Sequence, residues 1–113
     1  AEDTDSNYLL LSLMLRKEYE VIRAGDGEEV VRLCEQIQPD AVLMDIQMPV
    51  MDGLKATQQI RRSGSRVPII AVTAYAYDRD RQKALEAGCD EYLAKPLTGD
   101  TLRQTLHRLL AGE

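Results

Sequence analysis

Apolar residues along the chain follow two spacings, which alternate from one segment to the next. The longer segments, in which apolar residues tend to recur every three or four positions, are predicted helices at 6–18, 26–38, 54–62, 78–87 and 98–110. Between them lie short runs of strand type at 19–24, 41–44, 67–72 and 91–94. The pattern therefore predicts helices that alternate with strands along the whole chain.

The second predicted helix has the clearest end signals. Asp26 and Glu29 form a capping box, in which the Asp26 side chain accepts a hydrogen bond from the backbone of Glu29. Pro39 ends the helix, because the residue before a proline is disfavoured in helical conformation. The stripe predicted to face the core consists of Val30, Leu33, Cys34 and Ile37. In the first helix the apolar residues at helical spacing are Leu9, Leu10, Leu13 and Met14.

The run at 41–44 is apolar throughout and too short for a helix, so it is predicted to be a fully buried strand of a parallel sheet. Strands that alternate with helices form right-handed crossovers and an open parallel sheet covered on both faces. The chain has 113 residues and contains no linker or internal repeat, which predicts one α/β domain over 1–113. Ligands of such sheets bind beyond the carboxyl ends of the strands.

Composition narrows the classes of function. The net charge of −5 argues against a nucleic-acid interface, which needs clustered positive charge, but suits divalent cations. Cys34 and Cys89 lie far apart with no zinc-site spacing, so both are expected to pack as small apolar residues in a reducing compartment. No signal peptide or long apolar run is present, and the expected location is cytoplasmic.

Polar residues come directly after three of the predicted strands. Asp45 and Lys95 each follow a strand, and Thr73 follows Val72. A carboxylate at the end of a buried strand is costly unless it is paired, hydrogen-bonded or bound to a metal. Asp45 is therefore either a partner of Lys95 or a loop cap, or it is a nucleophile that attacks a phosphoryl group.

The acidic pair Glu2 and Asp3 has two interpretations as well. Such pairs usually carry solvated surface charge. With Asp45, however, they form the oxygen-rich set that Mg²⁺ prefers. Lys95 then holds a phosphoryl oxygen on the side away from the metal, and Thr73 donates a hydrogen bond to another. Taken together, these residues predict a magnesium and phosphoryl site at one edge of the sheet.

The segments EDTDSN, DAVLMDIQMPVMDG, PIIAVTAYA and GCDEYLAKP resemble the receiver domain of two-component response regulators and hybrid sensor histidine kinases over essentially the whole chain. The resemblance implies a flavodoxin-like, doubly wound parallel sheet of order 2-1-3-4-5. A receiver normally begins with an apolar strand that ends in the acidic pair, whereas this sequence begins at Ala1. Most of that strand is expected to be missing from the given chain, either as omitted upstream residues or supplied in another way.

The resemblance also implies a role for each site residue. Asp45 matches the phosphoacceptor, and Glu2 and Asp3 match the pair that binds Mg²⁺. The backbone carbonyl of Gln47 matches the remaining protein ligand of the metal. These assignments make Mg²⁺ the expected cofactor.

Three further residues match family residues that contact the phosphoryl group or respond to it. Thr73 and Lys95 match the hydroxyl and the lysine around the phosphoryl group. Tyr92 matches the aromatic residue whose inward rotation accompanies activation; taken without the resemblance, it is expected to be a half-buried aromatic of an edge strand.

The expected function is that of a phosphorelay switch. A histidine kinase or a histidine phosphotransfer domain donates the phosphoryl group from a phosphohistidine to Asp45, and the domain changes conformation. It catalyses only its own phosphorylation and dephosphorylation, whether it is a stand-alone regulator or part of a hybrid kinase. A homodimer through the last helices and strand is a further expectation. The alternative is a protein-interaction module that keeps the receiver fold without being phosphorylated.

Overall fold

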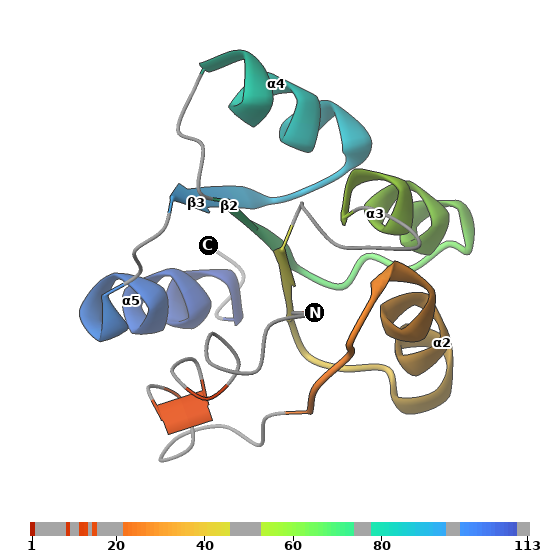
Figure 1. Ribbon diagram of the computed structural model, residues 1–113, viewed down its shortest axis with the longest axis horizontal. Helices are drawn as coiled ribbons and strands as arrows, with labels where there is room; N and C mark the ends of the chain where they lie inside the picture. Colours follow the sequence, from red (N-terminus) through yellow and green to blue (C-terminus); the bar gives the residue numbers. More distant parts are fainter. Residues whose placement is uncertain are drawn as a thin grey trace.

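Helices and strands alternate along the chain as the apolar spacing predicts (Figure 1). The computed structural model describes residues 1, 9, 12–13, 15, 22–45, 53–73, 78–94 and 98–110. From residue 27 onward its elements are α2 (Gly27–Ile37), β1 (Val42–Asp45), α3 (Gly53–Arg62), β2 (Ile69–Thr73), α4 (Asp78–Ala87), β3 (Glu91–Ala94) and α5 (Gly99–Leu110). Their ends differ from the predicted ones by two residues at most.

The three described strands form a parallel sheet in the order β1-β2-β3. They are the third, fourth and fifth strands of the expected order 2-1-3-4-5, and their order agrees with it. Asp45 lies opposite Val72, and Thr73 lies opposite Ala94. This register places the carboxyl ends of all three strands at one edge of the sheet.

Ala1 extends the sheet on the far side of β1. The main-chain nitrogen of Ala1 donates a hydrogen bond to the carbonyl of Leu43, and the amide of Asp45 donates to the carbonyl of Ala1 over 3.1 Å. A residue opposite Met44 in a parallel ladder makes this pair of bonds. Ala1 therefore occupies the place that the expected order assigns to the end of the first strand.

The strand predicted at 19–24 is not found in its described part. Ile22, Arg23 and Ala24 are not in a strand, and 19–21 lie outside the described residues. Residues 22–24 pair with no strand in the described part of the chain. Without a neighbouring ladder, alternating residues do not form a strand, although Ala24 is buried in the core.

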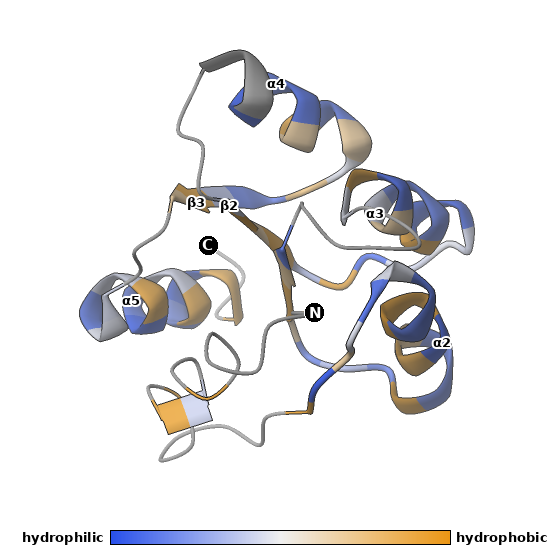
Figure 2. Cartoon of the chain, viewed as in Figure 1, coloured by the Kyte–Doolittle hydropathy of each residue, from blue (hydrophilic) through white to orange (hydrophobic). Residues whose placement is uncertain are grey.

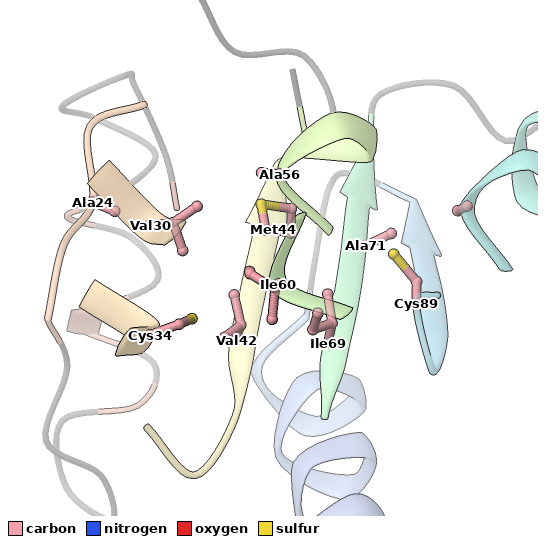
Figure 3. Close-up of a cluster of buried hydrophobic side chains, with 11 residues drawn as sticks. Ala24, Val30, Cys34, Val42, Met44, Ala56, Ile60, Ile69, Ala71 and Cys89 are labelled. Carbon is pink, nitrogen blue, oxygen red and sulfur yellow. The ribbon is translucent and has the colours of Figure 1, made fainter. Parts of the chain in front are cut away.

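Two apolar clusters lie on opposite faces of the sheet. Side chains alternate along a strand, so Ile69 enters one cluster and Ile70 the other. The first cluster joins β1 and β2 to α2, α3 and α4, and Figure 3 shows its side chains meeting over the strands. The second joins β2 to α5 and to Leu15. Helices thus cover both faces, as predicted.

Hydropathy follows this layering. In Figure 2 strands β1 and β2 are largely apolar, β3 is mixed, and the helices carry polar residues on their outer sides. None of the helices in the described part of the chain combines the length and apolar character needed to cross a bilayer.

The structure corrects two expected helix faces. Ile37 is 47% exposed, although it belongs to the stripe predicted to be buried. In the first helix Leu9 and Leu13 are exposed, and it is Leu15 that packs in the second cluster. Residues 9–15 are nearly all apolar, so helical spacing alone does not select the face that meets the sheet.

The structure contains the hydrogen bond predicted for the capping box at the start of α2. The amide of Glu29 donates to Oδ1 of Asp26 over 2.9 Å. We expect Asp26→Ala to lower the free energy of unfolding by about 1 kcal/mol, because one amide at the helix start loses its acceptor. Urea denaturation measures the change. Asp40→Ala removes an exposed aspartate outside any helix and serves as the control; equal losses in both variants would contradict the capping role.

Candidate functional site

Asp45 is the last residue of β1 and is only 8% exposed. The strand is paired with Ala1 on one side and β2 on the other, and the two apolar clusters cover its faces. A carboxylate in such a place costs free energy unless polar groups or a cation stabilise it. The Asp45 carboxylate therefore lies at the carboxyl edge of the sheet, where ligands of open parallel sheets bind.

Thr73 ends the neighbouring strand β2 and is 3% exposed. Because Asp45 is opposite Val72, Thr73 lies one residue further along on the adjacent strand. Adjacent strands are about 4.8 Å apart, so the two residues are close neighbours at this edge. The structure thus brings together Asp45 and Thr73, two of the expected site residues.

Described neighbours of the remaining expected site residues lie at the same edge. Ala94 lies opposite Thr73, and Lys95 is the next residue of the chain. Ala1 is bonded beside Asp45, and Glu2 follows it directly. Consecutive Cα atoms are about 3.8 Å apart, which limits how far each residue lies from the described edge. The side chains of Glu2, Asp3, Gln47 and Lys95 themselves lie outside the described residues.

The donor set suits a hard cation once the acidic pair is included. Within the described ranges no three histidine, cysteine or acidic side chains form a cluster able to hold a metal. Asp45 is the one expected ligand in those ranges, and Glu2 and Asp3 follow Ala1. Three carboxylates and a carbonyl are the oxygen ligands that Mg²⁺ prefers. The residues therefore fit magnesium in chemical type.

Tyr92 lies in β3 and packs, half-buried, against the first cluster. Its amide donates to the side chain of Glu91 over 3.3 Å. This confirms the packing expected of a half-buried aromatic in the last strand. The same position is three residues before Lys95, so a movement of the tyrosine would be close to the proposed phosphoryl site.

The two cysteines are buried free thiols in the first cluster. Burial raises the pKa of both thiols, since the thiolate is poorly solvated there. Thr57 makes a 3.6 Å hydrogen bond with Cys89, which opposes part of that rise in pKa. A thiol kept protonated is a poor nucleophile, so packing is the role of Cys34 and Cys89, as expected.

The main-chain role of Ala1 was not predicted. Strand pairing uses backbone atoms, which every residue has, and one alanine carries no spacing signal. The signal that points to it is the position of Ala1 directly before an acidic pair. The structure adds what the sequence lacks, namely which strand this segment lies beside.

Residues 1–107 match the model of a protein family described as the response regulator receiver domain. The hybrid signal transduction histidine kinase G of Dictyostelium discoideum is 42% identical over 95% of this chain, which spans 3% of that protein. Protein PilH of Pseudomonas aeruginosa is 36% identical over 98% of this chain and 94% of its own length. The chain thus spans a small part of the hybrid kinases it matches and nearly all of PilH.

Solved structures agree with these relatives. The receiver domain of sensor histidine kinase PA1611 from Pseudomonas aeruginosa has a TM-score of 0.91 and 43% identity, covering 98% of this chain and 93% of that one. That crystal structure has a magnesium ion coordinated in its active-site cleft. The likeness shows that the fold is flavodoxin-like, as the resemblance implies.

Proposed function

Because this chain belongs to the family of response regulator receiver domains of two-component systems, we propose that Asp45 accepts a phosphoryl group from a phosphohistidine. The observation that carries the proposal is the position of this buried carboxylate at the carboxyl edge of the sheet. Ala1 flanks it on one strand and Thr73 on the other. The proposed donors are a histidine kinase or a histidine phosphotransfer domain.

The reaction is an in-line displacement at phosphorus. A carboxylate oxygen of Asp45 forms the new P–O bond while the P–N bond of the phosphohistidine breaks, and its electron pair returns to the imidazole nitrogen. The transition state is loose, with charge spread over the phosphoryl oxygens. Catalysis therefore depends on positioning and on charge stabilisation more than on covalent chemistry.

Glu2, Asp3, Asp45 and the carbonyl of Gln47 are the proposed ligands of Mg²⁺. When bound, the cation neutralises phosphoryl oxygens and offsets the repulsion among the carboxylates. Support comes from the pairing of Ala1 with β1, which brings the start of the chain to Asp45. The PA1611 receiver, 43% identical to this chain, holds magnesium in its cleft.

Thr73 and Lys95 are proposed to hold the other phosphoryl oxygens. A hydroxyl hydrogen bond from Thr73 to the new phosphoryl group draws this residue toward Asp45, and Tyr92 follows into the space that it leaves. Phosphorylation then shifts the populations of two conformations of one fold. The half-buried packing of Tyr92 against the first cluster supports this role, because the ring is not enclosed in the core on all sides.

The proposal extends to the setting of the domain. The chain matches hybrid kinases and free-standing regulators alike, so both remain settings for the same phosphoacceptor. We propose a cytoplasmic location, where the phosphohistidine donors are made with ATP. The homodimer through the last helices and strand stays a prediction, tested by the oligomeric state before and after phosphorylation.

Removal of Mg²⁺ tests the metal directly. We expect incubation with acetyl phosphate and Mg²⁺ to add one phosphoryl group, measured by intact mass. An excess of chelator should lower the yield at least about tenfold, because the developing charge is no longer neutralised. Excess Mg²⁺ added after the chelator should restore it.

Each outcome of this experiment has a meaning for the proposal. An equal yield with and without the metal contradicts the proposed ligand role. No adduct on the folded protein under any condition contradicts phosphorylation and favours the interaction module. Circular dichroism of the same sample shows that the protein is folded.

A further inference from the structure

A second polar cluster lies at the opposite, amino-terminal edge of the sheet. It is centred on Arg61 in the last turn of α3. Nε donates to the carbonyl of Gly88 over 2.9 Å, and Nη1 donates to the carbonyls of Ser65 and Val67 over 3.1 and 2.8 Å. Nη2 donates to Oδ2 of Asp90 over 2.8 Å. One guanidinium thus joins three separate segments of the chain.

Asp90 carries the connection into the sheet. Its Oδ2 accepts from the amide of Ile69 over 2.8 Å, and its own amide donates to the carbonyl of Ile69 over 2.8 Å. These bonds continue the ladder between β2 and β3 by one position. Arg61 therefore holds the carboxylate that closes the amino end of this ladder.

The end of α4 is shaped to admit the arginine. Gly88 follows the helix with φ of +118°, a conformation that favours glycine. A Cβ atom at this position would lie 2.7 Å from Cγ of Arg61. The stem of Arg61 thus lies directly against the backbone where α4 turns into β3.

We infer that Arg61 is a positioning residue that anchors the carboxyl end of α4 and the start of β3 to α3. Arg61 is 23% exposed on its side chain, and its four bonds use most of the five N–H donors of a guanidinium. The planar guanidinium fixes the directions of its hydrogen bonds as well as their lengths. A change in the position of α4 must then turn about this anchored end.

The Arg61 anchor also affects the conformational change that follows phosphorylation, an inference that rests on the proposed function. The phosphoryl site is at the carboxyl edge of the sheet, whereas Arg61 holds the amino edge. Phosphorylation of Asp45 should therefore move the start of α4 and the carboxyl end of β3 more than the junction at 88–90. The anchor converts a local change at the site into a turn of α4 in one direction.

Amide hydrogen exchange on the unphosphorylated chain tests the anchor. Arg61→Met keeps an unbranched stem and removes every donor. The reporters are four amides at the junction of α4 and β3, each of which donates a hydrogen bond to a residue of α4, β2 or the junction itself: Ile69, Gly88, Cys89 and Asp90. We expect their protection factors to fall at least about tenfold more than the loss of global stability predicts. Arg61→Lys, with one ammonium in place of the fork, should give a smaller loss.

Two control variants separate anchoring from general destabilisation. Arg62→Met changes the neighbouring, exposed arginine of the same helical turn and should leave the junction amides unchanged. Val30→Ala opens a cavity under α2 and should lower protection throughout the core in proportion to global stability. An Arg61→Met profile that matches Val30→Ala, or an equal effect of Arg62→Met, overturns the inference.

The phosphorylated protein provides an independent readout. After treatment with acetyl phosphate and Mg²⁺, exchange in the wild-type chain should change at the start of α4 and by less than about twofold at 88–90. In Arg61→Met the change should reach the junction. Equal changes at both ends of α4 in the wild type overturn the pivot. A chain that takes up no phosphoryl group contradicts the proposed function alone, because the anchor is tested without it.

Discussion

Asp45→Asn is expected to abolish the phosphoryl adduct. An amide oxygen is a far weaker nucleophile than a carboxylate, and the rate of adduct formation should fall at least about a hundredfold. Intact mass after incubation with acetyl phosphate and Mg²⁺ measures this loss. Asparagine has nearly the same shape as aspartate, so the β1 strand keeps its packing. The folded state should lose little stability, since a buried charge is removed with the nucleophile.

The control for this variant is Asp40→Asn. Asp40 is exposed and lies shortly before β1, outside the carboxyl edge of the sheet. The Asp40→Asn variant should form the phosphoryl adduct at the wild-type rate. An adduct on Asp45→Asn at that rate would show that another residue is the phosphoacceptor, and peptide mapping would locate it. Loss of the adduct in both variants would point to an effect of the changed charge on the whole domain.

The second large effect is on stability, at Ile69. This side chain of β2 is fully buried and belongs to the first cluster, together with Val42 of β1 and Ile60 of α3 (Figure 3). We expect Ile69→Ala to lower the free energy of unfolding by about 2–5 kcal/mol, since apolar contacts are lost and a cavity remains. A domain of this size is stable by roughly 5–15 kcal/mol, so the change is large. Urea denaturation with a midpoint and slope measures it.

Ile37→Ala is the matched control. The residue type and the substitution are the same, but this side chain is 47% exposed at the end of α2. We expect a loss below about 1 kcal/mol, because little buried surface is removed. Similar losses for the two isoleucines would show that the first cluster is not the tightly packed core that the structure indicates.

Much of the fold could be predicted because its signals are local. Strand β1 is an unbroken apolar run that ends at Asp45, and the predicted end of the fourth helix at residue 87 is followed by Gly88, which has a positive φ. Asp26 accepts the amide of Glu29, as the capping box requires. In each case the residues that interact are close in the sequence, so spacing alone is informative.

Predictions from local sequence patterns were wrong where the structure depends on contacts with distant parts of the chain. The leucine-rich run at 9–15 is apolar around the whole helix, and only packing against α5 and β2 selects Leu15. Ile37 has the spacing of a buried residue, but it is the last residue of α2 and is 47% exposed. The strand expected at 19–24, of which residues 22–24 are described and are not in a strand, needs a neighbouring ladder, and no local pattern supplies one.

The candidate site also has a part that the sequence predicts and a part that depends on the tertiary structure. The sequence by itself determined which residue types end each strand, and so it predicted carboxylate, hydroxyl and ammonium groups at one sheet edge. Only the tertiary structure decided the register that sets Asp45 beside Thr73, the strand to which Ala1 is bonded, and the joining of Arg61 to Asp90. These depend on backbone pairing and on contacts between residues far apart in the chain. Such contacts form only when the whole sheet is assembled, and no short stretch of sequence encodes them.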